Sequence, residues 1–197
     1  DGTSHSAVAT ARLAATPVNA APVGNGQSVS TLEDTAKAIT LTGSDADNNP
    51  LTFSIVSSPT NGVLSGLNTN TGTVTYKPNT NFNGADSFTF RANDGTTNSA
   101  SPTLTIPVTP VYDAPMASGP SVSTPEDTAK AVTLTGSDVE NSPLTFSIVT
   151  GPTNGVLSGL NTNTGTVTSS PTTNSRGPSS SSTNVNDGTS NSDVATI

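Results

Sequence analysis

Residues 41–56 read LTGSDADNNPLTFSIV, and residues 134–149 repeat the stretch as LTGSDVENSPLTFSIV. In both copies a β-like run ends at a pair of acids, a polar turn follows, and a second β-like run begins. Leu51, Phe53 and Ile55 alternate with polar residues, which is the period-2 pattern of a strand with one buried face. The stretch therefore predicts two β-strands joined by an acidic turn.

The same stretch belongs to a long internal repeat. DGT begins at residues 1, 94 and 187, a spacing of 93 residues, and PTNGVLSGLNTNTGTVT occurs unchanged at 59–75 and 152–168. Self-similarity at a fixed period indicates tandem copies of one structural module. We expect residues 1–18 to hold the last strand of a preceding repeat plus a linker, residues 19–111 to form repeat 1, and residues 112–197 to form repeat 2.

Each repeat is predicted to contain seven short strands. In repeat 1 they are expected at 27–31, 36–42, 51–56, 62–65, 73–77, 86–92 and 102–109. The segments between them, such as NNP, PTNG and NDG, are typical of turns, and none shows a helical apolar stripe. Seven strands in about 93 residues predict an all-β fold of tandem Greek-key β-sandwiches. Two prolines in each linker, 16–24 and 109–117, disfavour helix and predict a semi-rigid rod.

Composition excludes several classes of function. The chain has 197 residues, 6 Lys and Arg against 14 Asp and Glu, and a net charge of −8, so it lacks the basic patch that nucleic acid or an anionic membrane requires. It contains no cysteine, which excludes disulfides and zinc–thiolate sites. No apolar run approaches the roughly 18 residues of a membrane helix. With His5 as the only histidine, no Ser–His–acid arrangement forms around a core site, and we expect no enzyme.

Several motifs resemble the tandem cadherin-like or bacterial immunoglobulin-like repeats of large bacterial surface adhesins. They are EDTAKAITLTGSDADNNPLTFSIV, NGVLSG, GTVTYKPNTNFNGADSFTFRANDG and TPVYDAP. The resemblance covers both repeats and both linkers. It implies a secreted or cell-surface location, and it implies calcium at the junctions between repeats.

The resemblance also implies which residues hold calcium, an ion that prefers about six to eight oxygen ligands. The acids implied as ligands are Glu33, Asp45, Asp47, Asp94, Asp113, Glu126, Asp138, Glu140 and Asp187. The junction between the repeats would gather Glu33, Asp113, Asp138, Glu140 and Asp187, and the junction before repeat 1 would gather Asn19, Asp45, Asp47 and Asp94. The alternative for each acid is an ordinary solvated turn, since Asp caps turns and NDG is a common turn signal.

The sequence departs from the family pattern in two ways. Asn81 and Asn83 stand where a cadherin carries acids, Ala20 stands where repeat 2 has Asp113, and Tyr112 replaces the linker asparagine, so calcium affinity should be low or some sites empty. The last third of repeat 2 also lacks four aromatic residues that repeat 1 has. Tyr76, Phe82, Phe88 and Phe90 are replaced by Ser169, Ser175, Ser181 and Thr183. This predicts support from neighbours or loose order in the last third of repeat 2.

Three functions remain open at this point. The first is a non-enzymatic stalk or spacer of a bacterial adhesin, with neighbouring repeats as partners and any host or matrix ligand bound by other domains. The second is a subunit of an extracellular filament, in which residues 1–15 complete the sheet of an identical subunit by strand addition. The third is a carbohydrate- or protein-binding module, which would need an exposed aromatic platform that 4% aromatic residues scarcely provide.

Overall fold

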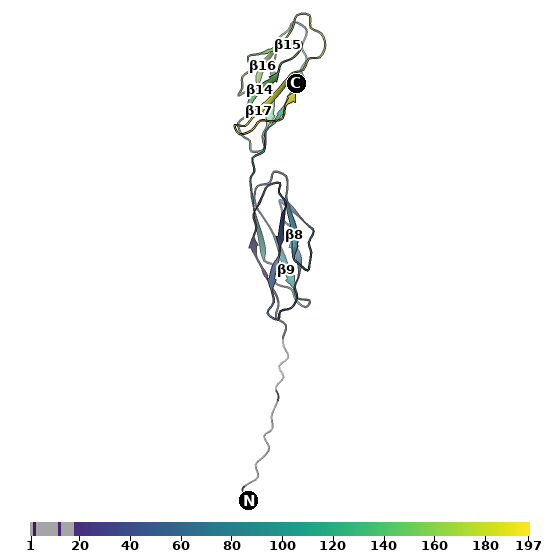
Figure 1. Cartoon of the computed structure of the whole chain (residues 1–197), viewed down its shortest axis with the longest axis vertical. Coiled ribbons are helices and arrows are strands. Elements are labelled where there is room, and N and C mark those ends of the chain that lie inside the picture. The colour runs from purple at the N-terminus through teal and green to yellow at the C-terminus, as the bar shows by residue number, and fades with distance from the viewer. Residues whose placement is uncertain (1, 3–11, 13–17) are drawn as a thin grey trace. The chain divides into compact units, whose positions relative to one another are not determined.

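The computed structural model describes residues 2, 12 and 18–197 (Figure 1). The expected strand at residues 1–15 thus lies almost entirely outside the described residues. The chain divides into two compact units, unit 1 from Asp1 to Pro110 and unit 2 from Val111 to Ile197. The described residues form strands and no helix, which confirms the predicted all-β fold.

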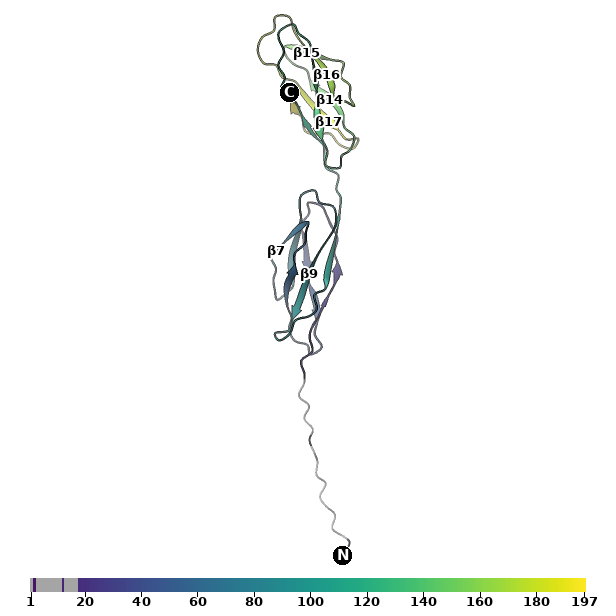
Figure 2. The same cartoon turned by 180° about the vertical axis from the view of Figure 1, so that it is seen from behind.

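The described residues of unit 1 form ten strands. They are β1 (Val23–Asn25), β2 (Gln27–Ser28), β3 (Thr31–Leu32), β4 (Lys37–Thr40), β5 (Thr42–Ser44), β6 (Thr52–Ser57), β7 (Gly62–Ser65), β8 (Thr73–Pro78), β9 (Gly84–Asn93) and β10 (Thr103–Thr109). One sheet has the order β2-β10-β9-β6, with β3 also paired to β10; a second has the order β4-β8-β7, and β1 pairs with β5. Both main sheets contribute buried side chains to one core, as in a β-sandwich. Figure 2 shows the unit from behind, with β7 and β9 labelled.

Unit 2 repeats this plan with fewer strands. They are β11 (Met116–Ser118), β12 (Lys130–Thr133), β13 (Thr135–Ser137), β14 (Thr145–Thr150), β15 (Gly155–Ser158), β16 (Thr166–Pro171), β17 (Ser182–Asn186) and β18 (Ala195–Thr196). Its sheets have the orders β12-β16-β15, β14-β17-β18 and β11-β13. The predicted period-2 strand LTFSIV appears as β6 in unit 1 and as β14 in unit 2.

Three features of unit 1 differ from the prediction. The single strand expected at 27–31 divides into β2 and β3. The single strand expected at 36–42 divides at Leu41, so that β4 pairs with β8 and β5 pairs with β1. At the division Leu41 is 1% exposed, and its N–H donates to the carbonyl of Gly72 at 2.9 Å. Strand β1 was not predicted, because its three residues are too short to show alternation and lie in the proline-containing linker.

Aromatic side chains fill the core of unit 1. Tyr76, Phe88 and Phe90 are at most 1% exposed, and they come from β8 and β9. The Tyr76 hydroxyl donates to Asp86 Oδ2 at 2.8 Å. Burial, this hydrogen bond and the carboxylate charge together raise the pKa of Tyr76 well above its usual range, so the hydroxyl stays a neutral donor.

Unit 2 keeps the sandwich with a smaller core. Its buried apolar residues are Val132, Leu134, Phe146, Val167 and Val185. Thr183, at the position of Phe90, is 0% exposed, and its hydroxyl donates to the Ser147 carbonyl at 2.6 Å. The buried Thr183 hydroxyl of unit 2 therefore has a hydrogen-bond acceptor, but smaller side chains stand where unit 1 has aromatic rings.

Candidate functional site

The acidic turn of unit 1 begins directly after β5. Asp45 Oδ1 accepts hydrogen bonds from the backbone N–H groups of Asp47 at 2.9 Å and Asn49 at 3.1 Å. Asn48 lies between them with a φ of 59°, a left-handed conformation that asparagine tolerates better than most residues. The second carboxylate oxygen of Asp45 is buried and has no hydrogen-bond partner. Such an atom is costly to leave unsatisfied.

A linker residue joins this turn to the turn after β9. Asn19 donates from Nδ2 to Asp94 Oδ2 at 2.8 Å, and its side-chain oxygen accepts from Asn49 Nδ2 at 3.1 Å. The neighbouring Ala20 N–H donates to Asp47 Oδ2 at 2.8 Å. The structure thus brings Asp45, Asp47 and Asp94 to one end of unit 1, which we call the N-terminal pole.

Asp94 is held as a carboxylate by its donors. Besides Asn19, the backbone N–H groups of Thr97 and Thr96 donate to Oδ1 at 2.6 and 2.7 Å. The Asn19 side chain, followed by the two backbone donors, lowers the pKa of Asp94 far below its ordinary 3.8. The pKa of Asp187, the counterpart in unit 2, is also lowered, chiefly by the N–H of Ser190. Both acids therefore stay charged at neutral pH.

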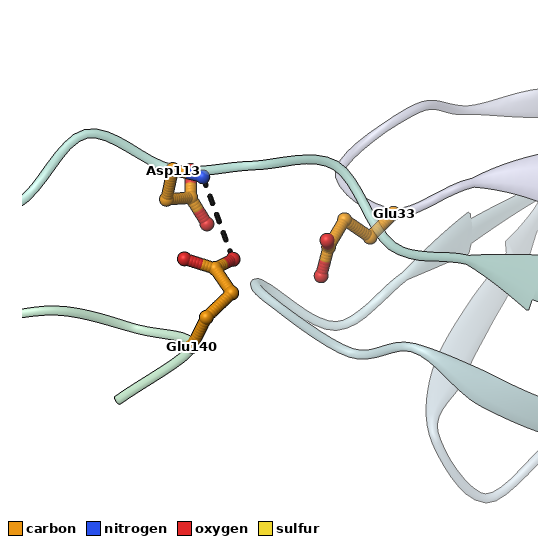
Figure 3. Close-up of side chains that lie close together, drawn as sticks. All are labelled: Glu33, Asp113 and Glu140. Atoms are coloured by element: carbon orange, nitrogen blue, oxygen red, sulfur yellow. Dashed lines mark hydrogen bonds between the residues drawn. The ribbon is translucent and has the colours of Figure 1, made fainter. Parts of the chain in front are cut away.

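The N-terminal pole of unit 2 repeats part of this arrangement. The Asp113 N–H donates to Glu140 Oε1 at 3.4 Å (Figure 3), as Ala20 does to Asp47, and the Ser142 N–H donates to Asp138 Oδ1 at 2.8 Å. Asp187 accepts only from its own turn in the hydrogen bonds described. Three carboxylate oxygens here are buried without a hydrogen-bond partner: Asp113 Oδ2, Asp138 Oδ2 and Glu140 Oε2.

The two predicted glutamates have different surroundings. Glu33, which follows β3, is 2% exposed and accepts from Asn83 Nδ2 at 3.4 Å. Glu126 instead forms an ion pair with Arg176 at 3.4 Å. Because the Arg176 side chain is 85% exposed and the Glu126 side chain is 40% exposed, this ion pair contributes little to the stability of the fold. Any cation at Glu126 would have to displace the guanidinium group of Arg176.

The donor set at each N-terminal pole fits a hard cation. It consists of carboxylate oxygens, and of an asparagine oxygen in unit 1, which are the ligands that calcium prefers. The unpartnered oxygens of Asp45 and Asp138 occupy equivalent positions, and a cation would satisfy both. The sequence analysis did not name Asn49 as a site residue. Its position shortly after the acidic motif DAD indicates a further polar side chain at this turn.

The low pKa of Asp94 leads to a prediction for acid stability. A carboxyl group whose pKa is lower in the folded state stabilises that state at pH values above its ordinary pKa. This contribution is lost as the pH falls from about 4 toward the pKa of the folded state. We expect Asn19→Ala to raise the pKa of Asp94 toward normal and to leave Asp187 unchanged, as measured by NMR titration of the carboxyl carbons. Equal shifts at both aspartates, or none at Asp94, would contradict the role of Asn19.

Comparisons with known proteins agree with the fold. The sequence profile described as "Bacterial Ig domain" matches residues 19–107 and 112–197. A search of curated proteins gave no match. In structure, the human desmocollin-1 ectodomain is similar over 92% of this chain and 36% of its own, with 15% identity and a TM-score of 0.54. Human protocadherin-24 EC1-2 is similar over 91% and 95%, with 14% identity and a TM-score of 0.54.

An endo-fucoidan hydrolase of glycoside hydrolase family 107 aligns over 90% of this chain with 23% identity and a TM-score of 0.42. The chain spans 28% of the length of that hydrolase and 33% of the protocadherin gammaB4 ectodomain. At these identities the cadherin ectodomains establish a shared fold.

Proposed function

Because the chain belongs to the bacterial Ig-domain family, we propose that its two units act as a non-enzymatic stalk or spacer of a bacterial adhesin. Bacterial Ig and cadherin-like families are typically non-enzymatic, and bacterial Ig domains usually sit in extracellular surface proteins. Among the described residues, no helix is long and apolar enough to cross a membrane. In a spacer of this kind, distance and stiffness are the function, and adhesion is carried elsewhere.

Calcium at the N-terminal poles is the means of stiffening that we propose. Glu33, Asp113, Asp138, Glu140 and Asp187 would contribute to the site that precedes unit 2. Asn19, Asp45, Asp47 and Asp94 would contribute to the site that precedes unit 1. Glu126 would take part at the far end of unit 2 after release from Arg176. Bound calcium would supply positive charge that offsets the repulsion among these acids.

One observation carries this proposal. Asp45 Oδ2 and Asp138 Oδ2 are both buried and have no hydrogen-bond partner, although their sister oxygens accept backbone N–H groups. A solvated turn would leave both oxygens in water. The same unpaired oxygen at two repeat-equivalent positions favours a ligand that is bound there.

A carbohydrate-binding role has less support. Sugar rings bind well to exposed aromatic platforms, and six aromatic side chains in the described residues belong to the buried cores or, for Phe82, pack against one. Tyr112 is the one described aromatic residue that is largely exposed, at 78%.

Thermal unfolding with and without calcium tests the calcium site. A cation that binds only the native state and is present at ten times its dissociation constant stabilises by about 1.4 kcal/mol. For domains of this size the Tm should rise by roughly 6–10 °C. We expect this rise in the parent chain relative to EDTA, and its loss in Asp45→Asn/Asp138→Asn. Asp193→Asn, which removes an exposed carboxylate that is not among the proposed ligands, should retain the rise.

A calcium-induced rise that survives in the double variant would show that these two acids are not ligands. The absence of any rise in the parent chain would show that the acids are solvated turn residues. The stalk would then owe its stiffness to the proline-containing linkers.

A further inference from the structure

The two main sheets of unit 1 have four edges among the described residues, and three of these are covered, interrupted or charged. Edge strand β6 is covered by a turn, since the Phe53 N–H donates to the Thr69 carbonyl at 2.8 Å. The edge formed by β2 and β3 is interrupted between the two strands and is followed directly by Glu33. The edge at β4 carries Lys37. Such edges resist the addition of another strand.

Strand β7 forms the fourth edge, and its outward backbone groups are open. In the described part of the chain β7 pairs only with β8 (Figure 2). The Asn79 N–H donates to the Asn61 carbonyl at 2.8 Å, so in this antiparallel ladder Val63 faces β8, whereas the N–H and C=O groups of Gly62 and Leu64 point away from it. These two residues form a sheet edge to which a further strand can add.

Unit 2 carries the same open edge on β15. The sequence PTNGVLSGLNTNTGTVT, which is identical in the two units, contains both edge strands. Strand β15 pairs only with β16 among the described residues, and Gly155 lies opposite Pro171 as Gly62 lies opposite Pro78. Proline has no N–H to donate, so in both units the glycine directs its backbone groups outward. The chain thus presents one kind of open edge twice.

The open edge lies in the uncharged part of an acidic chain. Residues 48–76 and 141–175 contain no Asp, Glu, Lys or Arg, although the whole chain has a net charge of −8. Two copies of such a chain repel each other through their acidic surfaces. An edge without acids is the part of each unit through which identical copies approach with the least repulsion. The charge distribution therefore favours a second copy of this chain as the partner of the edge.

Two of these edges are complementary as an antiparallel pair. Gly66 and Gly159, with φ values of 65° and 66°, are in the left-handed conformation and end the two edge strands. Within the strand that remains, one register pairs Gly62 with Leu64 of the second edge and uses every outward N–H and C=O group of both residues. This register is symmetric about a two-fold axis and places Val63 opposite the valine of the second edge.

The exposed valines fit this register. Val63 is 59% exposed and Val156 is 60% exposed, and pairing would cover both with an apolar neighbour across the strands. Lys77 lies beside Val63 on β8, whereas Ser170 lies beside Val156 on β16. The β15 edge has no charge on its own strand or on the next, so we expect it to pair more strongly than the β7 edge.

We propose that this open edge is an interface between copies of the chain, in which β7 or β15 of one copy pairs antiparallel with the same kind of edge on another. Each pairing joins two three-stranded sheets into one sheet of six strands. The contact is short, so the association is weak and reversible. Because every chain has two such edges, one chain binds two others. This inference goes beyond the stalk role and does not depend on calcium.

Cysteine cross-linking of the full chain tests the contact. The protein has no cysteine, so Val156→Cys introduces a single thiol, which the proposed register places opposite an identical thiol. Under mild oxidation in EDTA, it should form disulfide-linked dimers at least about tenfold faster than Val23→Cys, because pairing raises the effective concentration of the thiols. Val23 is the matched control, since it is 59% exposed in β1, outside the proposed contact. Val63→Cys should also exceed this control.

A charge on the edge tests whether the edge accounts for association. In sedimentation velocity, the average sedimentation coefficient of the parent chain should rise with protein concentration, and more steeply at high salt, which screens repulsion between acidic chains. Val63→Glu/Val156→Glu places like charges opposite each other across the pair and should keep the chain monomeric. Val23→Glu/Val194→Glu adds the same charge at exposed positions outside the edge and should still associate.

Three results would overturn the proposal. The first is an equal rate of cross-linking for Val156→Cys and Val23→Cys. The second is a parent chain that stays monomeric at its highest soluble concentration and at high salt. The third is association that persists in Val63→Glu/Val156→Glu, because the copies would then meet through another surface. Circular dichroism of each variant verifies that the fold is retained, as expected for substitutions of exposed side chains.

Discussion

Phe90→Ala is expected to destabilise unit 1 by about 4 kcal/mol. The side chain is 0% exposed in the middle of β9, and its ring centroid lies 6.4 Å from that of Phe53. Truncation of a buried phenylalanine loses the transfer free energy of the ring and leaves a cavity, a combined cost of about 3–5 kcal/mol. Calorimetry of the full chain should show one of its transitions move to lower temperature by roughly 15 °C or more.

The repeat provides the matched control at the equivalent position. Thr183→Ala removes the hydroxyl that donates to the Ser147 carbonyl and only one methyl group, so it should cost about 1–2 kcal/mol. This change should affect the other transition, which we assign to unit 2 and expect at the lower temperature because its core is smaller. Comparable costs for the two substitutions would contradict the assignment of Phe90 as a principal core residue.

Asp86→Ala is expected to cost about 3–4 kcal/mol, although it removes no large apolar group. Asp86 is 6% exposed, and its two oxygens accept from the Tyr76 hydroxyl at 2.8 Å and from the backbone N–H groups of Thr60, Asn61 and Ser87 at 2.9–3.1 Å. Removal of the carboxylate leaves these buried or half-buried donors without an acceptor. Each such loss costs about 1–3 kcal/mol where water cannot enter.

Urea unfolding of three further variants separates the contributions at Asp86. Tyr76→Phe should cost about 1–2 kcal/mol, because Asp86 keeps its backbone donors. The double variant Tyr76→Phe/Asp86→Ala should cost less than the sum of the single changes, because no hydroxyl is then left unpaired. Ser179→Ala, at the equivalent position in unit 2, loses the hydrogen bond from the Asn154 N–H and a long one with the Thr153 hydroxyl, both exposed, and should cost about 1 kcal/mol or less. An additive double variant would contradict the direct Tyr76–Asp86 interaction.

The sequence by itself determined the class of fold, the repeat and the position of the acidic turns. Alternation in LTFSIV predicted β6 and β14, because a period of 2 reports directly which face of a strand is buried. The spacing of 93 residues identified equivalent positions, and so revealed that Ser169, Ser181 and Thr183 stand where unit 1 has aromatic residues. These properties are local or comparative, and they require no knowledge of which strands pair.

Tertiary structure decided what depends on contacts between distant residues. The hydrogen bond from Leu41 to Gly72 and the bridge from Asn19 to Asp94 join residues 31 and 75 positions apart. Asp86 accepts from donors up to 26 residues away. No periodicity encodes these contacts. The same holds for the candidate cation sites. The sequence supplied the acids, but only the fold shows that one oxygen of Asp45 is satisfied while the other is buried and unpaired, because hydrogen bonding and desolvation of a carboxylate depend on the backbone packed around it.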